Sequence, residues 1–276
     1  MLKRILTAVF GVPLVFAFVV MSAYAPIAVD VAIAIVCSVS VGEFAHATRT
    51  LRQYQLSIPS IIFAVAYPML VSYVSGIIIL YAYTAVMMSV LILFHKKISF
   101  KEFAYIYSMT VIITLFLSTL ILTKNADSSH SAFYFLFFLG LPWLADIGAY
   151  FTGSLVGRHK LCPKISPKKT IEGVIGGTVV CVLATCLLTW IFADFIYNKT
   201  VTVNYINLAV LTFIGSLFSV LGDLSFSLVK RAFEIKDYGS IFPGHGGMLD
   251  RFDSVVFVSP LIMIFISYFP ILTPVQ

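Results

Sequence analysis

The sequence predicts an all-α polytopic integral membrane protein with about nine transmembrane helices, the N-terminus in the cytoplasm and the C-terminus outside. Three observations support this class. Of the 276 residues, 60% are hydrophobic and only 11% are charged, and the mean hydropathy is +1.02. Apolar runs of the ~20 residues that a spanning helix needs recur along the chain. Lysines and arginines gather in alternate loops, as is typical of cytoplasmic segments.

Two stretches decide how the spans are divided. Met1–Arg4 and the apolar residues after it have the outline of a signal peptide, but further apolar segments follow directly, so we expect an uncleaved first span. Ile58–Phe94 has no charged residue and is too long for one crossing of ~30 Å of hydrocarbon, so we divide it at Ser75-Gly76. The predicted spans are 5–22, 27–45, 58–74, 77–94, 104–123, 133–153, 173–194, 205–229 and 254–272.

The basic residues support this layout independently. With a cytoplasmic N-terminus, all of the 18 lysines and arginines except Lys124 and Lys199 fall on the cytoplasmic side. A miscounted span would exchange the sides of every later loop and remove the asymmetry. We therefore expect residues 1–125 to be scaffold and lipid-facing helices. Residues 126–276 are expected to form a catalytic transmembrane region with cytoplasmic loops at 154–172 and 230–253.

Some polar residues favour structural interpretations. Glu43 and His46 lie one helical turn apart near the cytoplasmic end of the second span, where an interfacial polar pair is the simpler interpretation. The four cysteines lack the spacing of metal or redox motifs. Three of them lie in apolar runs, where a small buried thiol packs well.

The most polar stretch is Ser227–Asp253, SLVKRAFEIKDYGSIFPGHGGMLDRFD. Its glycines let the main chain approach a ligand closely. Basic groups, bare backbone N–H groups and carboxylates together suit a polyphosphate carried with a divalent cation. The helix dipole alone would stabilise one acid at the start of the last helix by ~0.3–1 kcal/mol. It hardly explains Asp250 and Asp253 together with His245, Arg251 and three glycines.

A second segment carries a carboxylate at membrane depth. Asp146, Tyr150, Gly153 and Gly157 step by four, three and four and therefore share one helix face. Such a carboxylate is costly and favours a functional site, although a structural contact with a neighbouring helix is the alternative.

A third segment is the basic loop that follows. Positive-inside topology and attraction to anionic lipids explain Lys160 and Lys164. They explain Ser166-Pro-Lys168-Lys169-Thr170-Ile-Glu172-Gly less well, because hydroxyls and a carboxylate stand there at a predicted helix start, where anions bind.

A fourth segment is a polar stripe on an otherwise apolar helix. Ser219, Asp223, Ser227 and Lys230 step by four, four and three. A stripe of this kind must face protein or a wet cavity rather than lipid. Helix–helix contact would explain the serines alone, whereas Asp223 with Lys230 favours a site.

Five carboxylates could converge near the cytoplasmic membrane face: Asp146, Asp223, Asp237, Asp250 and Asp253. Hard oxygen ligands favour Mg²⁺ over zinc. A Mg²⁺ site lined with lysines and arginines indicates a substrate that carries phosphate. A membrane site open to both cytosol and lipid then suggests a lipid phosphate that meets a nucleotide.

These residues resemble a known signature. Ser227-Leu-Val-Lys230-Arg231, then Lys236-Asp237-Tyr-Gly239, then Ile241 through Asp253 resemble the phosphatidate cytidylyltransferase (CDP-diacylglycerol synthase) family without a departure. Trp143–Arg158, Ser166–Gly173 and Gly222-Asp223 are similar to it too. The first half resembles the family only in its hydrophobic layout.

The resemblance implies that CTP and phosphatidate react to CDP-diacylglycerol and pyrophosphate, with Mg²⁺, in a helical fold of about nine spans, usually a homodimer. It implies a multi-pass protein of the bacterial inner membrane with its active site facing the cytoplasm. Membrane lipids, but no nucleic acid, are expected as further partners. Whether dCTP replaces CTP, and whether a monovalent cation such as K⁺ shares the site, stay open.

The resemblance also implies roles for single residues. Asp223 and Asp250 would be the metal carboxylates, with Asp253 as a supporting carboxylate or second ligand, and Asp146 would face the same cavity. Phosphates would be held by basic residues, and the phosphate loop would be shaped by a histidine and two glycines. These residues are Lys168, Lys169, Lys230, Arg231, Lys236 and Arg251, and His245, Gly246 and Gly247.

Other function classes remain open from the residues alone. Intramembrane carboxylates also suit a cation-coupled transporter, although no repeat symmetry is visible. A CTP-dependent kinase of a membrane alcohol would release CDP instead of pyrophosphate. A purely structural membrane protein would leave the loop from Lys230 to Asp253 unexplained.

Overall fold

The computed structural model describes residues 27–126, 130–242, 244 and 246–274. The first predicted span, 5–22, lies outside them. The described chain is mostly helical, and six of its helices are long and apolar enough to cross a membrane. The protein is thus a multi-pass membrane protein, while the count of nine spans and the sides of the termini stay predictions. The helices are α2 (Ile27–Ala47), α3 (Tyr54–Leu70), α4 (Gly76–Leu93), α5 (Phe100–Ala126), α6 (Ser131–Val156), α7 (Ile171–Ile191), α8 (Tyr205–Ala232) and α9 (Leu249–Tyr268).

The chain folds into two compact units. The first comprises 1–125 with 230–252, and the second comprises 126–229 with 253–276. Helices α8 and α9 therefore contribute residues to both units. Each unit is described by itself below.

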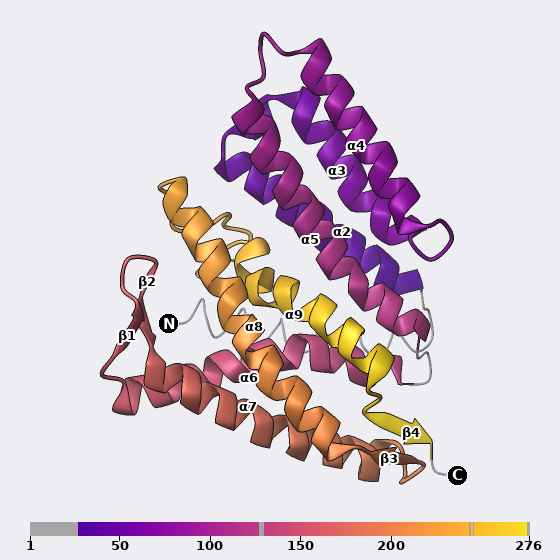
Figure 1. Ribbon diagram of the computed structural model, residues 1–276, viewed down its shortest axis with the longest axis vertical. Helices are drawn as coiled ribbons and strands as arrows, with labels where there is room; N and C mark the ends of the chain where they lie inside the picture. The colour runs from indigo at the N-terminus through magenta and orange to yellow at the C-terminus, as the bar shows by residue number, and fades with distance from the viewer. Residues whose placement is uncertain (1–26, 127–129, 243, 245, 275–276) are drawn as a thin grey trace. The chain divides into compact units, whose positions relative to one another are not determined.

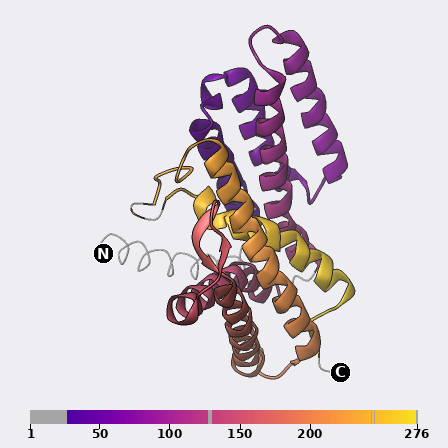
Figure 2. The same ribbon diagram turned by 60° about the vertical axis from the view of Figure 1, so that its left-hand side comes forward.

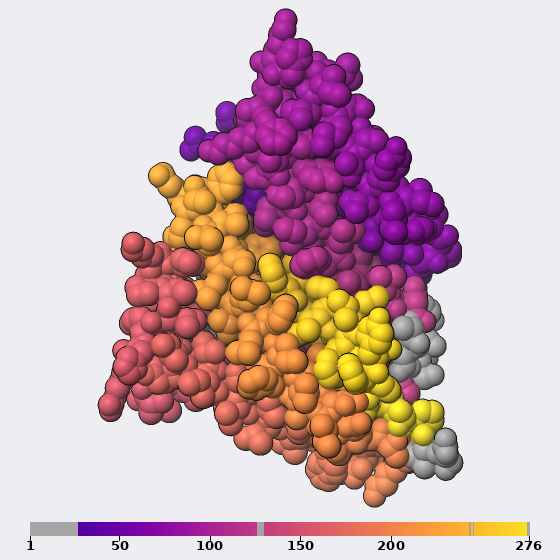
Figure 3. Space-filling model, viewed as in Figure 1, coloured from indigo at the N-terminus to yellow at the C-terminus, as the bar shows by residue number. Residues whose placement is uncertain are grey.

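In the first unit, α2–α5 lie side by side in both views (Figures 1 and 2), and side chains fill the spaces between them (Figure 3). Aromatic rings stack from α3 through α4 to α5, with centroid distances of 4.1 Å for Phe63–Tyr83 and 5.5 Å for Tyr83–Tyr107. A partly buried ion pair of 2.5 Å joins Lys124 of α5 to Asp30 of α2. The predicted break at Ser75-Gly76 is confirmed, because α4 begins at Gly76.

In the second unit, glycines allow α6 and α7 to pack closely. A Cβ added at Gly148 would lie 3.0 Å from the Cα of Gly177, and one at Gly177 would lie 2.7 Å from the carbonyl oxygen of Ala145. Small residues of this kind let helix backbones approach in membranes, where no hydrophobic force drives helices together. Hydroxyl pairs join α7 to α8, at 3.1 Å for Thr185–Thr212.

The part of the chain that the structure describes also contains four short strands, which the sequence did not predict, outside the long helices. Strand β1 (Lys160–Cys162) pairs antiparallel with β2 (Ser166–Thr170), and β3 (Val201–Val203) pairs with β4 (Leu272–Pro274). The segment predicted as the loop 154–172 is thus the end of α6 followed by a hairpin. Lysine and proline residues on such short strands give little strand signal, because their pattern matches that of a basic loop.

Candidate functional site

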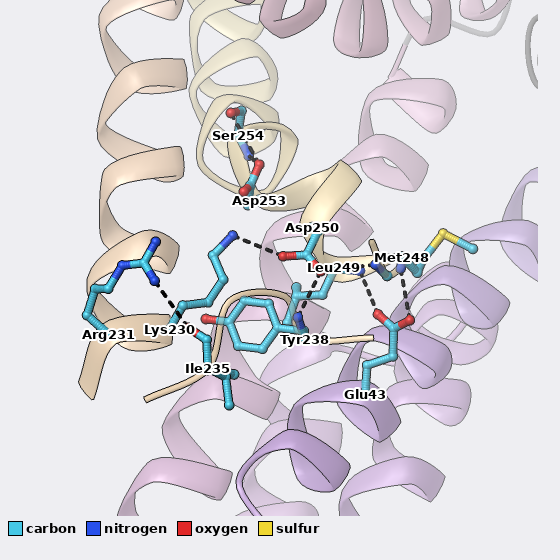
Figure 4. Close-up of polar contacts among 11 residues, drawn as sticks. Glu43, Lys230, Arg231, Ile235, Tyr238, Met248, Leu249, Asp250, Asp253 and Ser254 are labelled. Carbon is cyan, nitrogen blue, oxygen red and sulfur yellow. Dashed lines mark hydrogen bonds and ion pairs between the residues drawn. The ribbon is translucent and has the colours of Figure 1, made fainter. Parts of the chain in front are cut away.

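The glycine loop between α8 and α9 is organised around Asp250 in the first unit (Figure 4). Lys230, in the last turn of α8, lies 2.9 Å from Asp250 Oδ1. The other oxygen, Oδ2, accepts hydrogen bonds from the backbone N–H groups of Tyr238 at 2.8 Å and Gly247 at 3.0 Å. The Asp250 side chain is only 4% exposed. Lys230 Nζ also lies 5.5 Å from the centre of the Tyr238 ring, which favours a cation.

Glu43 holds the same loop from the scaffold side (Figure 4). Its carboxylate accepts hydrogen bonds from the backbone N–H groups of Met248 at 3.0 Å and Leu249 at 2.9 Å. These are N–H groups at the start of α9, which have no partner within the helix. A negative charge at this end is also favoured by the helix dipole. Glu43 of α2 therefore caps the N-terminus of α9, although the two lie far apart in the sequence.

The glycines of the loop fit around these two carboxylates. A Cβ at Gly239 or Gly247 would overlap the Glu43 carboxylate. Gly246 has φ +88°, in the left-handed region that side chains rarely adopt, and its carbonyl accepts a hydrogen bond from Phe242 N at 2.9 Å. We name Glu43, Lys230, Tyr238, Gly247 and Asp250 the loop cluster.

A second group of charges lies in the second unit, where Lys169 Nζ is 2.6 Å from Asp223 Oδ2. Both side chains are about one-fifth exposed, at 21% and 22%. Lys169 is placed by strand β2, next to Thr170, whose hydroxyl caps α7 by accepting a hydrogen bond from Gly173 N at 3.2 Å. The Ser219 side chain, one turn before Asp223, is fully buried, as the predicted polar stripe requires.

The hairpin that carries Lys169 is held at its base by Glu172. Its carboxylate accepts hydrogen bonds from the backbone N–H groups of Arg158 at 3.1 Å and His159 at 3.2 Å, and contacts His159 Nδ1 at 2.5 Å. The hydroxyl and carboxylate predicted at this helix start thus serve to position the basic strand.

Asp253 lies where α8 and α9 pack closely in the second unit. Its side chain is buried, and its Oδ1 accepts a hydrogen bond from Ser254 N at 2.7 Å. A Cβ at Gly222 would lie 2.8 Å from the Asp253 carbonyl oxygen, so glycine beside Asp223 permits the close approach of the two helices.

The remaining predicted residues fall into three sets. The first set comprises five charged residues with exposed side chains. The second comprises two glycines that shape the loop as described, and the third is one residue outside the described part. The exposed residues are Asp146, Lys168, Arg231, Lys236 and Arg251, the glycines are Gly246 and Gly247, and the last is His245.

Of the five carboxylates predicted to converge, Asp237 and Asp250 belong to the first unit and the other three to the second, so their convergence stays a prediction. In neither unit do the described residues contain a group of three or more His, Cys, Asp or Glu side chains placed to hold a metal ion. Asp250 and Asp223 are instead each paired with a lysine. The oxygen donors still suit Mg²⁺, which usually binds one or two protein carboxylates together with substrate phosphates.

The sequence did not predict a role for Glu43 in the site. It predicted only an interfacial polar pair of Glu43 with His46. That interpretation is wrong, because Glu43 is buried and bonded to the start of α9 while His46 is exposed. The missed signal was the cost of a carboxylate in an apolar helix, which requires a specific partner.

The comparisons with known proteins agree with the sequence resemblance. A model of the cytidylyltransferase family matches residues 2–269. A phosphatidate cytidylyltransferase of Staphylococcus saprophyticus is 40% identical over 185 residues, which cover 67% of each chain. One of Staphylococcus haemolyticus is also 40% identical over 185 residues and 67% of each chain. One of Staphylococcus aureus is 48% identical over 136 residues, 49% of this chain and 50% of the relative. This chain belongs to the cytidylyltransferase family.

Proposed function

We propose that this protein transfers the cytidylyl group of CTP to phosphatidate and so makes CDP-diacylglycerol and pyrophosphate. The observation that carries the proposal is the glycine loop that surrounds the buried Asp250–Lys230 pair, in a membrane chain of the cytidylyltransferase family. Relatives that share 40–48% identity are named for this activity. The family match favours this function over the kinase and the transporter that the residues alone left open.

The reaction is a displacement at the α-phosphorus of CTP. A phosphate oxygen of phosphatidate forms the new bond, and the bond to the β-phosphate oxygen breaks, so that pyrophosphate leaves. The nucleophile is already an anion, so a strong general base is not needed. Catalysis then depends on holding two anionic substrates together and on neutralising charge during displacement.

The loop cluster suits one part of this task. Backbone N–H groups in a glycine loop bind phosphate oxygens well. Asp250 accepts hydrogen bonds from the N–H groups of Tyr238 and Gly247 and pairs with Lys230, so it holds the shape of the loop while its own charge is satisfied. Arg231, Lys236 and Arg251 are exposed on or beside the loop, which supports a role in binding the triphosphate.

Lys169 and the exposed Lys168 suit the second task of holding the lipid phosphate. They lie on strand β2 at the start of a membrane-spanning helix, where an anionic headgroup would meet the protein. The helix N-terminus that Thr170 caps adds a favourable partial charge.

By the family resemblance, Asp223 and Asp250 would hold Mg²⁺ together with the substrate phosphates, and Asp253 would be a supporting carboxylate or a second ligand. When bound, the metal would neutralise charge on the phosphates during displacement. The metal requirement is measured as pyrophosphate release with Mg²⁺, with EDTA and with K⁺ added or omitted.

We further propose a homodimer in the bacterial inner membrane with the reaction on the cytoplasmic side. The support is the family resemblance and the distribution of lysines and arginines along the sequence. Cysteine labelling from either side of the membrane at Lys168→Cys and at Lys199→Cys would give opposite accessibility, and equal accessibility would contradict the assignment of sides.

The experiment that tests the function is pyrophosphate release by purified protein with CTP, phosphatidate and Mg²⁺, each omitted in turn. Release that needs all three, with a CDP-lipid product, is the expected result. Asp250→Asn is expected to remove turnover, while Arg52→Gln, a surface change on the cytoplasmic side of the scaffold, should retain it. CTP consumption independent of lipid would contradict the proposal.

A further inference from the structure

An apolar groove of about 390 Å³ runs between α7 and α8 in the second unit. Six residues of α7 between Val174 and Leu183 line it, with Phe213 and Leu217 of α8. Its volume falls in the range of small-molecule sites, ~300–1,000 Å³. The one polar lining residue, Thr178, accepts a hydrogen bond from Ser216 at 2.9 Å. The groove therefore presents a hydrocarbon surface.

The groove opens sideways on two membrane-spanning helices. Val179 and Leu183 of α7 line it and are more than half exposed, at 53% and 66%. The ten residues from Val174 to Leu183 span ~13 Å along the helix. An elongated apolar ligand that enters from the bilayer fits this opening.

One end of the groove leads toward a cation. Helices α7 and α8 run antiparallel, because Lys169 before α7 pairs with Asp223 late in α8, while Thr185 late in α7 bonds Thr212 early in α8. Val174 follows Lys169 by five residues, so the Lys169 end is also the start of the groove. The groove is thus apolar along its length, with the Lys169–Asp223 pair and the exposed Lys168 near one end, which suits a lipid that carries a phosphate headgroup.

We propose that this groove binds an acyl chain of the phosphatidate substrate while Lys169 holds its phosphate. The inference rests on the proposed function and adds to it the place of the lipid chain. A second copy of the protein is a less suitable occupant, because helix interfaces in membranes use small residues, whereas this wall is made of valine, leucine, isoleucine and phenylalanine side chains.

The test is Val179→Trp, which fills the groove from its exposed wall. An acyl chain in the bilayer is already surrounded by hydrocarbon, so its binding to the groove is stabilised by van der Waals contact and not by the hydrophobic effect. We expect kcat/KM for dioleoyl phosphatidate to fall about five- to tenfold, which is ~1–1.4 kcal/mol of lost contact. The kcat/KM for dihexanoyl phosphatidate should stay within about twofold of the wild-type value, because a short chain reaches little of the groove. The KM for CTP should also stay within about twofold.

The matched control is Leu187→Trp, on the same helix at 56% exposure and outside the groove. It should leave both substrates unchanged. An equal loss for long and short chains in Val179→Trp, or a changed oligomeric state without chain-length discrimination, would overturn the groove assignment. If wild-type protein made no CDP-lipid from either substrate, the proposed function itself would fail.

A second measurement does not depend on a folded variant. Phosphatidate with a photoreactive diazirine in its acyl chain should label wild-type peptides within 174–183, and competing dioleoyl phosphatidate should suppress the label. Labelling confined to other helices, or labelling in 174–183 that an excess of uncharged diacylglycerol suppresses equally, would refute the proposal.

Discussion

Removing the Glu43 carboxylate should reduce catalysis more than stability. In Glu43→Ala, the N–H groups of Met248 and Leu249 lose acceptors at 3.0 and 2.9 Å. Hydrogen bonds to a charged group contribute ~1.5–3 kcal/mol each, and the helix dipole adds ~0.3–1 kcal/mol. The lower end of this sum, ~3 kcal/mol, corresponds to about a hundredfold at ~1.4 kcal/mol per factor of ten. We expect kcat/KM for CTP to fall by about that factor.

The conservative variants separate charge from shape. Glu43→Gln keeps one acceptor oxygen and should lose about tenfold, because only one of the two N–H groups remains bonded. Glu43→Asp, with a shorter side chain, should fail to reach both N–H groups. The assay is pyrophosphate release as a function of CTP concentration, with unfolding temperature measured on the same preparations.

A matched control exists in the same unit. Glu102 accepts hydrogen bonds from Ser99 N at 2.9 Å and Ser99 Oγ at 2.7 Å, and so caps α5 in the same chemical way. Glu102→Gln should lower the unfolding temperature by an amount similar to Glu43→Gln but leave kcat/KM within about twofold. The reasoning fails if Glu43→Ala keeps wild-type activity, or if both variants lose activity in proportion to stability.

Three further predictions follow from the packing. Gly247→Ala should lower kcat/KM at least about tenfold, because its Cβ would displace Glu43, and the double variant with Glu43→Ala should lose less than the sum of the two effects. Asp223→Asn and Lys169→Met should each impair turnover with phosphatidate, and a strictly additive double variant, measured by lipid kinetics, would contradict their 2.6 Å pairing. Gly177→Leu should prevent α6 and α7 from packing and abolish recovery of folded protein from membranes, which chromatography in detergent measures.

Helix positions were predictable because a membrane span is mostly a matter of apolar length. The helix after the predicted break begins at Gly76, and α9 begins at Leu249 with Asp250 in its first turn, as expected. The hairpin at Lys160–Thr170 was not predicted, since its residues read equally well as a basic loop. Local pattern therefore located the long helices and missed short strands that depend on pairing.

The site was only partly predictable for a related reason. The signature located Lys230 and Asp250, which the structure pairs at 2.9 Å. Glu43 was missed because its partners are backbone N–H groups 205 and 206 residues away, and a backbone group leaves no mark in the sequence. A charged residue within an apolar helix is thus better treated as evidence of a distant partner than as a local pair.

The two lysine–carboxylate pairs agree with the finding that, among the described residues of each unit, no three acidic, histidine or cysteine side chains are placed to hold a metal ion. Several carboxylates close together would repel one another in a poorly solvated site. A lysine beside each of Asp223 and Asp250 satisfies the charge at distances of 2.6 and 2.9 Å. An enzyme whose substrates bring their own phosphates needs few fixed acidic ligands, because those phosphates supply the remaining oxygen donors of a Mg²⁺ ion. The same phosphates provide anionic partners for the lysines. Paired charges of this kind therefore suit a site completed by its substrates more than one that holds a metal permanently.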